Sequence, residues 1–396
     1  MKLNCIIQVP ILSLGFKQPS ISNSQLPCSQ MIDLQGHLLF RERIILSILS
    51  GKSLKISKIR SDLDNPGLER GEISFLKLIE KITEGSTIEI NHTGTAIKFK
   101  PGIIKGGEVE HDCDLSKSIG FYLEPLIAIA PFSKFAFKLT LTGITTQINK
   151  ESGPSVDALR LGYIPLLKHY GIENMDLIQL KVPKRGAHPL GGGEVHFSCP
   201  VILASVPWNL KDEGKVCKIR GIATTCRVSP QIANRLVEAS RSHLNPFLND
   251  IYIHTDVLKG AESGRSPGWN LCLVAETTKG TVYFSEGCGG ANIAPEDVAE
   301  QVSKDLLKKI NFGGVVDCKL HRMLMLMMSC GPSDLFKAKI SAPSSLTQSW
   351  LRELDAFMGV AFKMRNCTTT EDKSAARCVN ISVIGTGFVN FGKRAQ

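Results

Sequence analysis

The chain has 396 residues, more than the roughly 250–300 residues that one hydrophobic core usually serves, so at least two packed units are expected. Hydrophobic residues make up 43% and charged residues 21%, which is typical of a globular protein and unlike a disordered chain. No apolar run approaches the roughly 20 residues of a membrane-spanning helix, so no membrane partner is expected.

Positive charge dominates the sequence: Lys and Arg number 47 against 37 Asp and Glu, a formal net charge of +10. Such an excess favours polyanionic partners, RNA or DNA first, because bound phosphates release counterions. The alternative is a solvated basic surface. Aromatic residues make up only 6%, so stacking on single-stranded bases is expected to contribute little.

Twelve cysteines are scattered along the chain without a C-x-x-C pair, and several lie in apolar stretches such as "LCLVAE". This pattern is typical of reduced, buried thiols in a cytosolic or nuclear protein. Neither disulfides nor a structural zinc site is expected.

Residues 1–30 differ in character from the rest of the chain. One Lys followed by an apolar stretch resembles the start of a signal peptide, but Asn4, Gln8 and Pro10 interrupt that stretch. A disordered tail or a misassigned start is favoured instead.

From about residue 37 onward, strand and helix patterns alternate. Apolar and basic residues alternate over 52–60, which predicts a half-exposed strand. Residues 71–83 place apolar side chains on a broad helical face. Two short strands are expected within 86–102, turning at Thr93–Gly94.

A second, similar unit begins near residue 108. A helix is expected over 114–132, with Asp114 as its N-cap and Pro131 at its end. It is followed by a strand at 134–145, a helix at 155–171 closed by Gly171, and a strand at 175–184.

A third unit occupies the C-terminal part. A helix at 294–314 carries Val298, Val302, Leu306 and Ile310 on one stripe. Two further helices are expected at 320–331 and 346–358, and a strand at 378–388.

The segment between the second and third units has a different order of elements. Strands are expected at 214–228, 250–258 and 271–278, with a helix at 229–244 capped by Ser229. The predicted fold class is therefore α/β (α+β), with helices packed on sheets. A large domain would comprise 31–199 and 284–396, and 200–283 would form an inserted domain.

The stretch "RGAHPLGGGEVHF" at 185–197 contains the three glycines Gly191, Gly192 and Gly193. A phosphate-binding P-loop would need a Lys-Ser/Thr pair and a following helix, whereas a strand pattern follows here. Successive glycine amides can still form an anion-binding nest. The alternative, close backbone packing at the start of a strand, is somewhat favoured by the residue chemistry alone.

The same stretch fits the pattern R-G-x-x-P-x-G-G-G-x-[LIV], and it resembles a signature of the RNA 3'-terminal phosphate cyclase family. Other stretches resemble the cyclase-like branch of that family in the same order: "GHLLFRERIILSILSGKSLKISKIRSDLDNPGL", "PGIIKGGEVEHDCDLSKSIGFYLEPL", "SVDALRLGYIPLLK" and "SPGWNLCLVAET". The resemblance covers about residues 35–396. It implies three repeated two-helix, four-strand units resembling the C-terminal domain of a bacterial translation initiation factor, plus a small inserted α/β domain.

The resemblance also implies adenylate chemistry on a His side chain, and this sequence has no His at the corresponding position. Active members use ATP and a divalent metal, through an adenylate on a His in a motif like E-H-L-A-D-Q ahead of an apolar helix. Counting back from Gly331 places Cys318 at the His position, and the motif is absent. His321 could be a displaced nucleophile, but a partly buried or surface His beside Arg322 is favoured, because a nucleophile must be placed closely at the reacting group.

The candidate anion- or RNA-binding pocket comprises Arg185, Gly191, Gly192, Gly193 and His111. His111 lies in "EHDCD", where metal ligation is less favoured than a helix cap beside a buried Cys, so no metal is expected. Basic residues near strands are equally consistent with phosphate contacts and with a dispersed surface. They are Lys52, Lys55, Lys58 and Arg60; Lys181, Lys184 and Arg185; and Lys215, Lys218 and Arg220.

The favoured function is an RNA- or protein-binding factor in small-subunit pre-rRNA processing and 40S assembly, without cyclase activity. The resemblance implies a nuclear and nucleolar location, and as partners a nucleolar GTPase of ribosome assembly and the small-subunit pre-rRNA with its processing ribonucleoprotein. No cofactor is expected, and binding of an anion or ATP is left open. The alternatives are an active ATP-dependent RNA 3'-terminal phosphate cyclase and a nucleotide sensor without chemistry.

Overall fold

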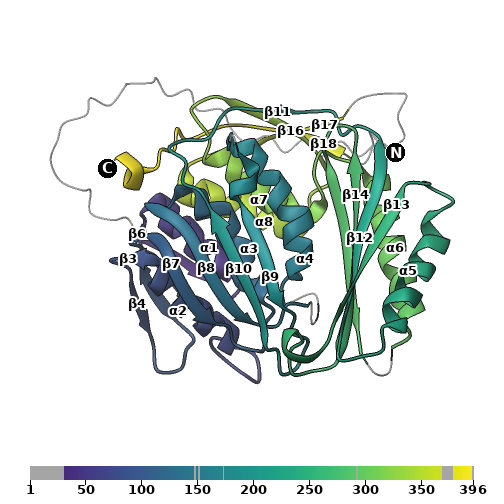
Figure 1. Ribbon diagram of the computed structural model, residues 1–396. Coiled ribbons are helices and arrows are strands. Elements are labelled where there is room, and N and C mark those ends of the chain that lie inside the picture. Colours follow the sequence, from purple (N-terminus) through teal and green to yellow (C-terminus); the bar gives the residue numbers. More distant parts are fainter. Residues whose placement is uncertain are drawn as a thin grey trace.

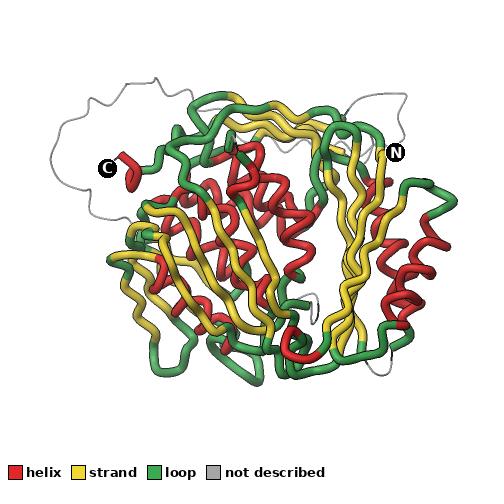
Figure 2. Tube along the Cα trace, viewed as in Figure 1, coloured by secondary structure: helices red, strands yellow, loops and turns green. Residues whose placement is uncertain are grey.

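A computed structural model of the chain describes residues 31–146, 149, 152–172, 174–290, 293–367 and 378–394. The tail predicted at 1–30 lies outside these residues. Four four-stranded sheets organise the described chain, as Figures 1 and 2 show. Helices α1, α3, α7 and α8 fill the middle of the molecule, and α5 and α6 lie beyond the sheet at the right of Figure 1.

The first and second sheets come from the N-terminal half. The first contains β1 (Ile32–Gln35), β2 (Leu54–Ser57), β5 (Ile97–Lys100) and β4 (Thr87–Ile90), with helices α1 (Phe40–Ser50) and α2 (Arg70–Ile82). The second contains β7 (Gly106–Asp112), β8 (Phe135–Gly143), β10 (Gly193–Cys199) and β9 (Gln179–Lys184), with α3 (Ile119–Ile129) and α4 (Val156–Ala158). A small ribbon pairs β3 (Thr83–Glu84) with β6 (Ile103–Ile104).

The third and fourth sheets come from the C-terminal half. The third contains β11 (Asn209–Leu210), β16 (Leu335–Ser341), β18 (Cys378–Ile384) and β17 (Lys363–Asn366), with α7 (His321–Ser329) and α8 (Ser345–Met358). The fourth contains β13 (Ile251–Leu258), β12 (Val216–Cys226), β14 (Gly268–Thr277) and β15 (Val282–Gly289), with α5 (Gln231–Leu244) and α6 (Pro295–Phe312). A last short helix, α9, spans Phe391–Arg394.

Strand order distinguishes the fourth sheet from the other three. We number the four strands of each sheet by their order in the chain. Across each of the first three sheets they then lie as first, second, fourth and third, and only the first and second strands are parallel. In the fourth sheet the order is second, first, third, fourth. Three sheets therefore share one topology and the fourth has its own.

Two hydrophobic cores hold these layers together. The larger joins the helices of the first three sheets and includes Phe75, Phe137 and Trp350. The smaller lies between the fourth sheet and its two helices, and includes Leu236, Leu271 and Leu306. Apolar burial of this extent is the main stabilising contribution to such layers.

The structure confirms most of the predicted elements and corrects three details. Helix α5 begins at Gln231, and its N-cap is Pro230 rather than the predicted Ser229. Helix α3 begins at Ile119 rather than at Asp114. The Asp114 carboxylate accepts from the Ser116 amide at 2.9 Å, so it closes a local turn instead of capping the helix. Residues 155–171 are not one α-helix: after α4 the chain forms a π-turn (Leu159–Tyr163) and a 3-10 helix (Ile164–Tyr170), where Pro165 cannot donate an α-helical hydrogen bond.

The boundary predicted at residue 283 falls inside β15, which pairs with β14 over its whole length. Helix α6, assigned from sequence to the large domain, packs on the fourth sheet, because its stripe with Val302 and Leu306 meets Leu236 of α5. The fourth sheet and its helices thus extend from Val216 to Phe312.

Two further properties follow from the described residues. The ten cysteines among them are all free thiols. None of the helices in the described ranges has the length and apolar character needed to span a membrane.

Candidate functional site

The largest concentration of charged side chains lies in a cleft where α1, α3, α7 and α8 all begin. We refer to it as the central cleft. Its lining includes residues 37–42, Arg60, Glu69, Glu72, Lys117, Phe121, Glu124, Gly153, Pro154, Tyr163, Cys318, Lys319, Arg322, Ser344, Leu346 and Thr347. The cleft therefore combines residues from the first, second and third sheets' helices.

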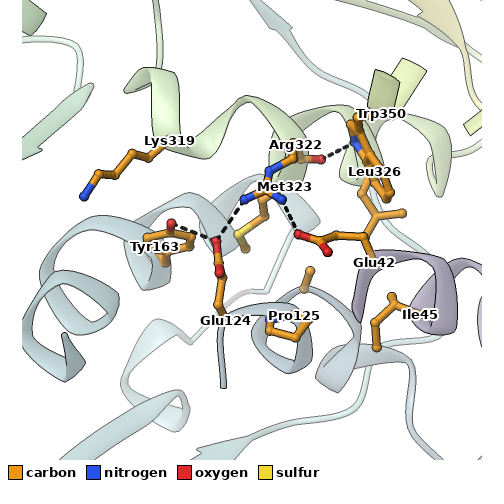
Figure 3. Close-up of a pocket in the computed structure, with 11 residues that line it drawn as sticks. Glu42, Ile45, Glu124, Pro125, Tyr163, Lys319, Arg322, Met323, Leu326 and Trp350 are labelled. Atoms are coloured by element: carbon orange, nitrogen blue, oxygen red, sulfur yellow. Dashed lines mark hydrogen bonds and ion pairs between the residues drawn. The ribbon is translucent and has the colours of Figure 1, made fainter. Parts of the chain in front are cut away.

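Arg322, in the first turn of α7, is the centre of one ionic cluster (Figure 3). Its guanidinium donates to Glu42 of α1 and lies 3.6 Å from Oε1 of Glu124 in α3. The indole N–H of Trp350 in α8 donates to the Arg322 carbonyl at 3.0 Å. Arg322 thus links helices that belong to different sheets.

Glu124 gathers further donors in the same cluster. The Tyr163 hydroxyl donates to it at 3.0 Å, and Nη2 of Arg41 donates at 3.1 Å. The Arg41 guanidinium carbon lies 4.2 Å from the centre of the Phe121 ring, a cation–π contact. Burial, and then the Glu124 carboxylate, raise the pKa of the Tyr163 phenol, so it stays a neutral donor.

Glu42 remains ionised although only 14% of its side chain is exposed. Burial opposes its charge, but Arg322 and then Arg41 outweigh that effect and lower its pKa. In the same way, Glu42 and Glu124 outweigh the desolvation of Arg322 and raise its pKa. Both sides of the cluster are therefore charged at neutral pH.

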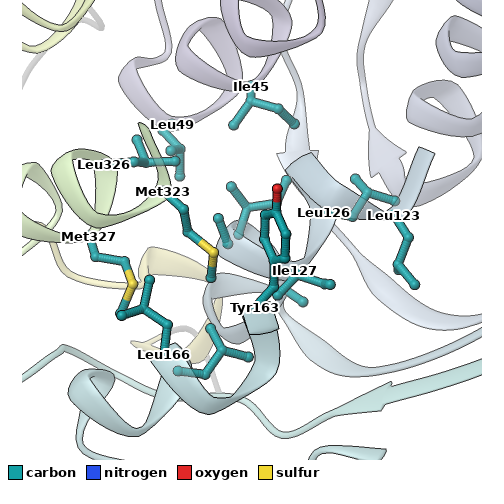
Figure 4. Packing of buried hydrophobic residues seen from close by; sticks show 14 of the residues in the cluster. Ile45, Leu49, Leu123, Leu126, Ile127, Tyr163, Leu166, Met323, Leu326 and Met327 are labelled. Atoms are coloured by element: carbon teal, nitrogen blue, oxygen red, sulfur yellow. The ribbon is translucent and has the colours of Figure 1, made fainter. Parts of the chain in front are cut away.

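Apolar side chains of the larger core, shown in Figure 4, line the same pocket as the charged residues of this cluster. Met323 and Leu326 of α7 pack with Ile45 of α1 and Leu126 of α3 in the larger core. This core is almost inaccessible to solvent: Leu126 is 0% and Ile45 1% exposed. The charged side chains thus border a core that excludes solvent.

A second ionic cluster lines the opposite part of the central cleft. Arg60 donates to both oxygens of Glu72, at 2.8 and 2.9 Å, and lies 3.1 Å from Glu69. Lys117 lies 2.8 Å from the same Glu69 carboxylate. Arg60 has a positive φ of 48°, a conformation that is uncommon and unfavourable for a residue other than glycine.

The cations of the central cleft therefore each have a carboxylate partner. Arg41, Arg60, Lys117 and Arg322 pair within the cleft, and Lys319 pairs with Glu286 at 3.2 Å. A phosphate group entering the cleft would compete with these carboxylates, which already satisfy the donors.

Two residues that the sequence singled out line the central cleft: Arg60, a candidate phosphate contact, and Cys318, at the predicted nucleophile position. Cys318 is exposed, in a 3-10 turn before α7. Partial desolvation, and then the Asp317 carboxylate, raise the pKa of its thiol, although Lys309 and Lys319 act in the opposite direction. The thiolate, which is the nucleophilic form, is therefore disfavoured.

His321 lies behind the cleft wall rather than in it. His321 is 1% exposed, and its Nε2 lies 3.3 Å from the Ser341 hydroxyl. Burial lowers the pKa of His321 to about 4, although Asp317 acts in the opposite direction. His321 is therefore a neutral side chain at pH 7, and it is more deeply buried than the partly buried or surface His that the sequence favoured.

The glycine run lies at the junction of the second and fourth sheets. Gly191 and Gly192 have φ of 58° and 87°, and Gly193 begins β10. A Cβ on Gly193 would lie 2.7 Å from the amide nitrogen of Gly186. The Gly191 carbonyl accepts a hydrogen bond from the backbone amide of Arg265 at 3.0 Å. The run packs backbone against backbone, and an anion at this loop remains a prediction.

Arg185 turns inward at the same junction. It donates to both oxygens of Asp157, at 2.5 and 3.0 Å, and its Nη2 lies 2.9 Å from Asp256 of the fourth sheet. Arg185 is 2% exposed and Asp157 1%. The geometry thus makes Arg185 a buried link between two sheets, and offers no free donors for the predicted anion.

His111 lies in another place again, at the end of β7. Its Nε2 is 2.9 Å from the Ser74 hydroxyl of α2, and burial lowers its pKa to about 4. Its neighbour Asp112 accepts from Thr142 at 2.6 Å, and Cys113 is buried. Within the described residues no group of three His, Cys, Asp or Glu side chains is placed to hold a metal ion.

The structure therefore brings Arg185 and the three glycines to one junction, through Gly264 and Arg265, but places His111 elsewhere, against α2. Sequence reasoning also passed over the clustered Arg41, Glu42, Glu124 and Arg322. One signal could have found them: each is a charged residue inside an apolar helical stretch, "FRERIIL", "FYLEPLIAI" or "LHRMLML". Charged residues in such positions are rarely buried unless they are paired.

Comparison with known proteins identifies the family. The family model described as RNA 3'-terminal phosphate cyclase matches residues 32–364. An RNA 3'-terminal phosphate cyclase-like protein of Mus musculus is 45% identical over 363 residues, which cover 90% of this chain and 96% of the relative.

Two fungal relatives carry a different name. The rRNA processing protein rcl1 of Schizosaccharomyces pombe is 40% identical over 372 residues, covering 93% of this chain and 99% of its own length. The rRNA processing protein RCL1 of Saccharomyces cerevisiae is 40% identical over 309 residues, covering 78% of this chain and 83% of its own length. Because the family model and these relatives match over most of the chain, the protein belongs to the RNA 3'-terminal phosphate cyclase family.

Proposed function

We propose that this protein is a ribosome-biogenesis factor that acts in small-subunit pre-rRNA processing and 40S assembly by binding RNA and protein, without cyclase activity. The two relatives named rRNA processing proteins support the rRNA part of this proposal, since they match 93% and 78% of the chain. The net charge of +10 supports a polyanionic partner.

The observation that carries the proposal is the state of the two candidate nucleophiles. His321 is buried and bonded toward Ser341, away from the central cleft. Cys318 faces the cleft, but its raised pKa keeps the thiol protonated. An adenylate-forming enzyme needs an activated nucleophile at the reacting phosphate, and neither side chain supplies one.

The pairing of the cleft cations supports the same conclusion. ATP-dependent chemistry uses free cations to stabilise transferring phosphoryl groups. In the central cleft, Arg41, Arg60 and Arg322 already contact carboxylates. We therefore propose that the protein uses no cofactor, and that any ATP or other anion binds in the cleft without reacting.

The proposal extends to partners, location and repeats. We propose a nucleolar GTPase of ribosome assembly and the small-subunit pre-rRNA with its processing ribonucleoprotein as partners, and the nucleus and nucleolus as the location. The first three sheets share one strand order, which supports three repeated units like the C-terminal domain of a bacterial initiation factor.

The test is incubation of the purified full chain with labelled ATP, a divalent metal and an RNA that ends in a 3'-phosphate. We expect no acid-labile covalent label on the protein and no cyclic phosphate on the RNA. A stoichiometric label that is lost in Cys318→Ser or His321→Gln would overturn the proposal in favour of an active cyclase. ATP binding without label or turnover agrees with the absence of cyclase activity, and it would favour the nucleotide sensor only if the chain also failed to copurify with pre-rRNA.

A further inference from the structure

The third sheet carries cations on the face that is turned away from the core. In β16, Phe336, Ala338 and Ile340 are buried, so the alternate residues Lys337 and Lys339 lie on the opposite face. In Figure 1 this sheet lies along the top of the molecule, with α7 and α8 beneath it. The face with the lysines is therefore directed outward.

Strand register arranges these cations in two rows. Lys337 lies opposite Ser382 of β18, and Ser382 lies opposite Lys363 of β17. In the next row Lys339 lies opposite Asn380, which lies opposite Arg365. Each row is therefore a cation, a short polar side chain and a second cation, on strands about 4.8 Å apart.

The other three four-stranded sheets pair most of the lysines on their outer faces, although Lys100 of β5 and Lys181 of β9 form no ion pair with a described residue. Carboxylates on neighbouring strands pair with lysines there: Asp33 with Lys55, Glu89 with Lys98, Glu108 with Lys138, Glu194 with Lys184, and Glu276 with Lys218.

On the third sheet, Lys339 alone has such a partner, Glu213, at 3.3 Å. Lys337, Lys363 and Arg365 form no ion pair with any described residue. Like charges on neighbouring strands repel each other, so this face is stabilised when an anionic partner covers it.

We propose that this face, formed by Lys337, Lys363, Arg365, Asn380 and Ser382, binds the sugar–phosphate backbone of double-stranded RNA. The inference rests on the proposed function and assigns a surface to it. Lys, Arg, Ser and Asn side chains are the usual phosphate and sugar donors, and they fix position rather than read sequence. None of the five is aromatic, so the face offers no platform for stacking unpaired bases.

An acidic protein segment fits the same face less well. Protein interfaces are anchored by aromatic or apolar side chains at their centre, surrounded by a polar rim. Here the centre is polar, and the exposed apolar pair Leu335 and Ile384 lies at the end of the strands, beyond the first row. A regular polyanion such as an RNA backbone matches the rows better.

The experiment measures the affinity of the full chain for an RNA duplex of about 20 base pairs, longer than the roughly 16 base pairs that a double-stranded-RNA module spans. The triple variant Lys337→Gln, Lys363→Gln, Arg365→Gln is compared with the unaltered chain across salt concentrations. We expect about tenfold or more loss of affinity, and a salt slope smaller by about 3, one for each phosphate contact.

The matched control is Lys55→Gln, Lys98→Gln, Lys138→Gln, which removes the same charge from paired positions on two other sheets. It is expected to keep affinity and slope close to the original. Equal losses in both variants, or no loss in the first, would overturn the inference and leave the proposed function standing.

Two further probes identify the ligand class. Polyglutamate that binds as tightly as the RNA duplex and loses affinity in the first variant would overturn the inference in favour of an acidic protein partner. Tighter binding of a DNA duplex of equal length would also overturn it. Conversely, the triple variant could lose RNA binding while the unaltered chain fails to copurify with pre-rRNA. That result would contradict the proposed function but would support the RNA-binding face.

Discussion

Arg185 donates to both carboxylate oxygens of Asp157, at 2.5 and 3.0 Å, and the two side chains are among the most buried charged groups in the protein. Asp256 adds a third contact from the fourth sheet. The pair joins the second and fourth sheets at the point where the glycine run also packs. The pair and Asp256 thus connect α4, the end of β9 and β13 by buried charged contacts.

Replacing Asp157 by Asn should destabilise the protein strongly. The change leaves the buried Arg185 with only Asp256 as a charged partner, and breaking a buried ion pair costs about 3–5 kcal/mol. Chemical denaturation of the purified chain measures the effect. Asp33→Asn, which breaks the more exposed pair with Lys55, is the control and should cost about 1 kcal/mol or less. Equal stabilities for the two variants would contradict the structural role of Arg185.

The glycine run offers a comparison between adjacent positions. In Gly193→Ala the new Cβ would lie 2.6 Å from the Thr145 methyl and 2.7 Å from the Gly186 nitrogen, so the backbone must move. In Gly192→Ala the nearest atoms are 3.4 Å away, and only the positive φ of 87° is unfavourable, by about 1–2 kcal/mol. Thermal denaturation should show the larger loss for Gly193→Ala. The reverse order would argue against close packing as the reason for this run.

The pairing of cleft cations predicts weak anion binding that one substitution should improve. Glu69→Gln removes the carboxylate shared by Arg60 and Lys117 at the edge of the central cleft. We expect the affinity for inorganic phosphate, measured by calorimetry at low salt, to rise about five- to tenfold, since an exposed charge contributes about 1 kcal/mol.

Glu89→Gln is the matched control for this measurement, because Glu89 pairs with Lys98 on the first sheet and does not line the cleft. It should leave phosphate affinity unchanged. An identical rise in both variants would mean that net charge, not the cleft, determines binding.

His321 predicts a specific dependence of stability on pH. Its folded pKa of about 4 is below the ordinary value of 6.5, so the unfolded chain binds the proton more readily. The stabilisation is therefore fully present above pH 6.5 and is lost as the pH falls toward 4. Between pH 7 and pH 5 the loss should reach about 2 kcal/mol.

A difference measurement isolates this residue from other titrating groups. His321→Gln cannot titrate, so its free energy of unfolding should fall less than that of the original chain over the same pH range. His111 and His169, whose pKa values are also lowered by burial, contribute equally to both proteins. Parallel pH profiles for the two proteins would show that His321 is not buried in its neutral form.

Much of the fold follows from local sequence patterns. Helix α2 is predicted within a residue of its bounds because its apolar face repeats at the helical period, and α6 because Pro295 and Gly313 mark its ends. The predicted start of α3 was wrong because an Asp such as Asp114 is equally common in a turn and at a helix N-cap. Its actual N-cap, Ser118, uses its hydroxyl to donate to the Ser152 carbonyl.

The candidate site is predicted less well, for a physical reason. Local patterns indicate which residues are polar, but not which of them meet. Arg322 and Glu42 are 280 positions apart in the chain, and only the packing of α7 against the other helices joins them. Likewise, the outward rows of Lys337 and Lys363 depend on the register of three strands, which no single segment encodes.

The central claim is that this protein binds small-subunit rRNA precursors rather than modifying RNA ends. The most direct measurement is affinity purification of the full chain from its own cells, followed by sequencing of bound RNA and identification of bound proteins. We predict recovery of small-subunit pre-rRNA together with assembly proteins, including a GTPase. Recovery of neither pre-rRNA nor ribosome-assembly proteins would contradict the account.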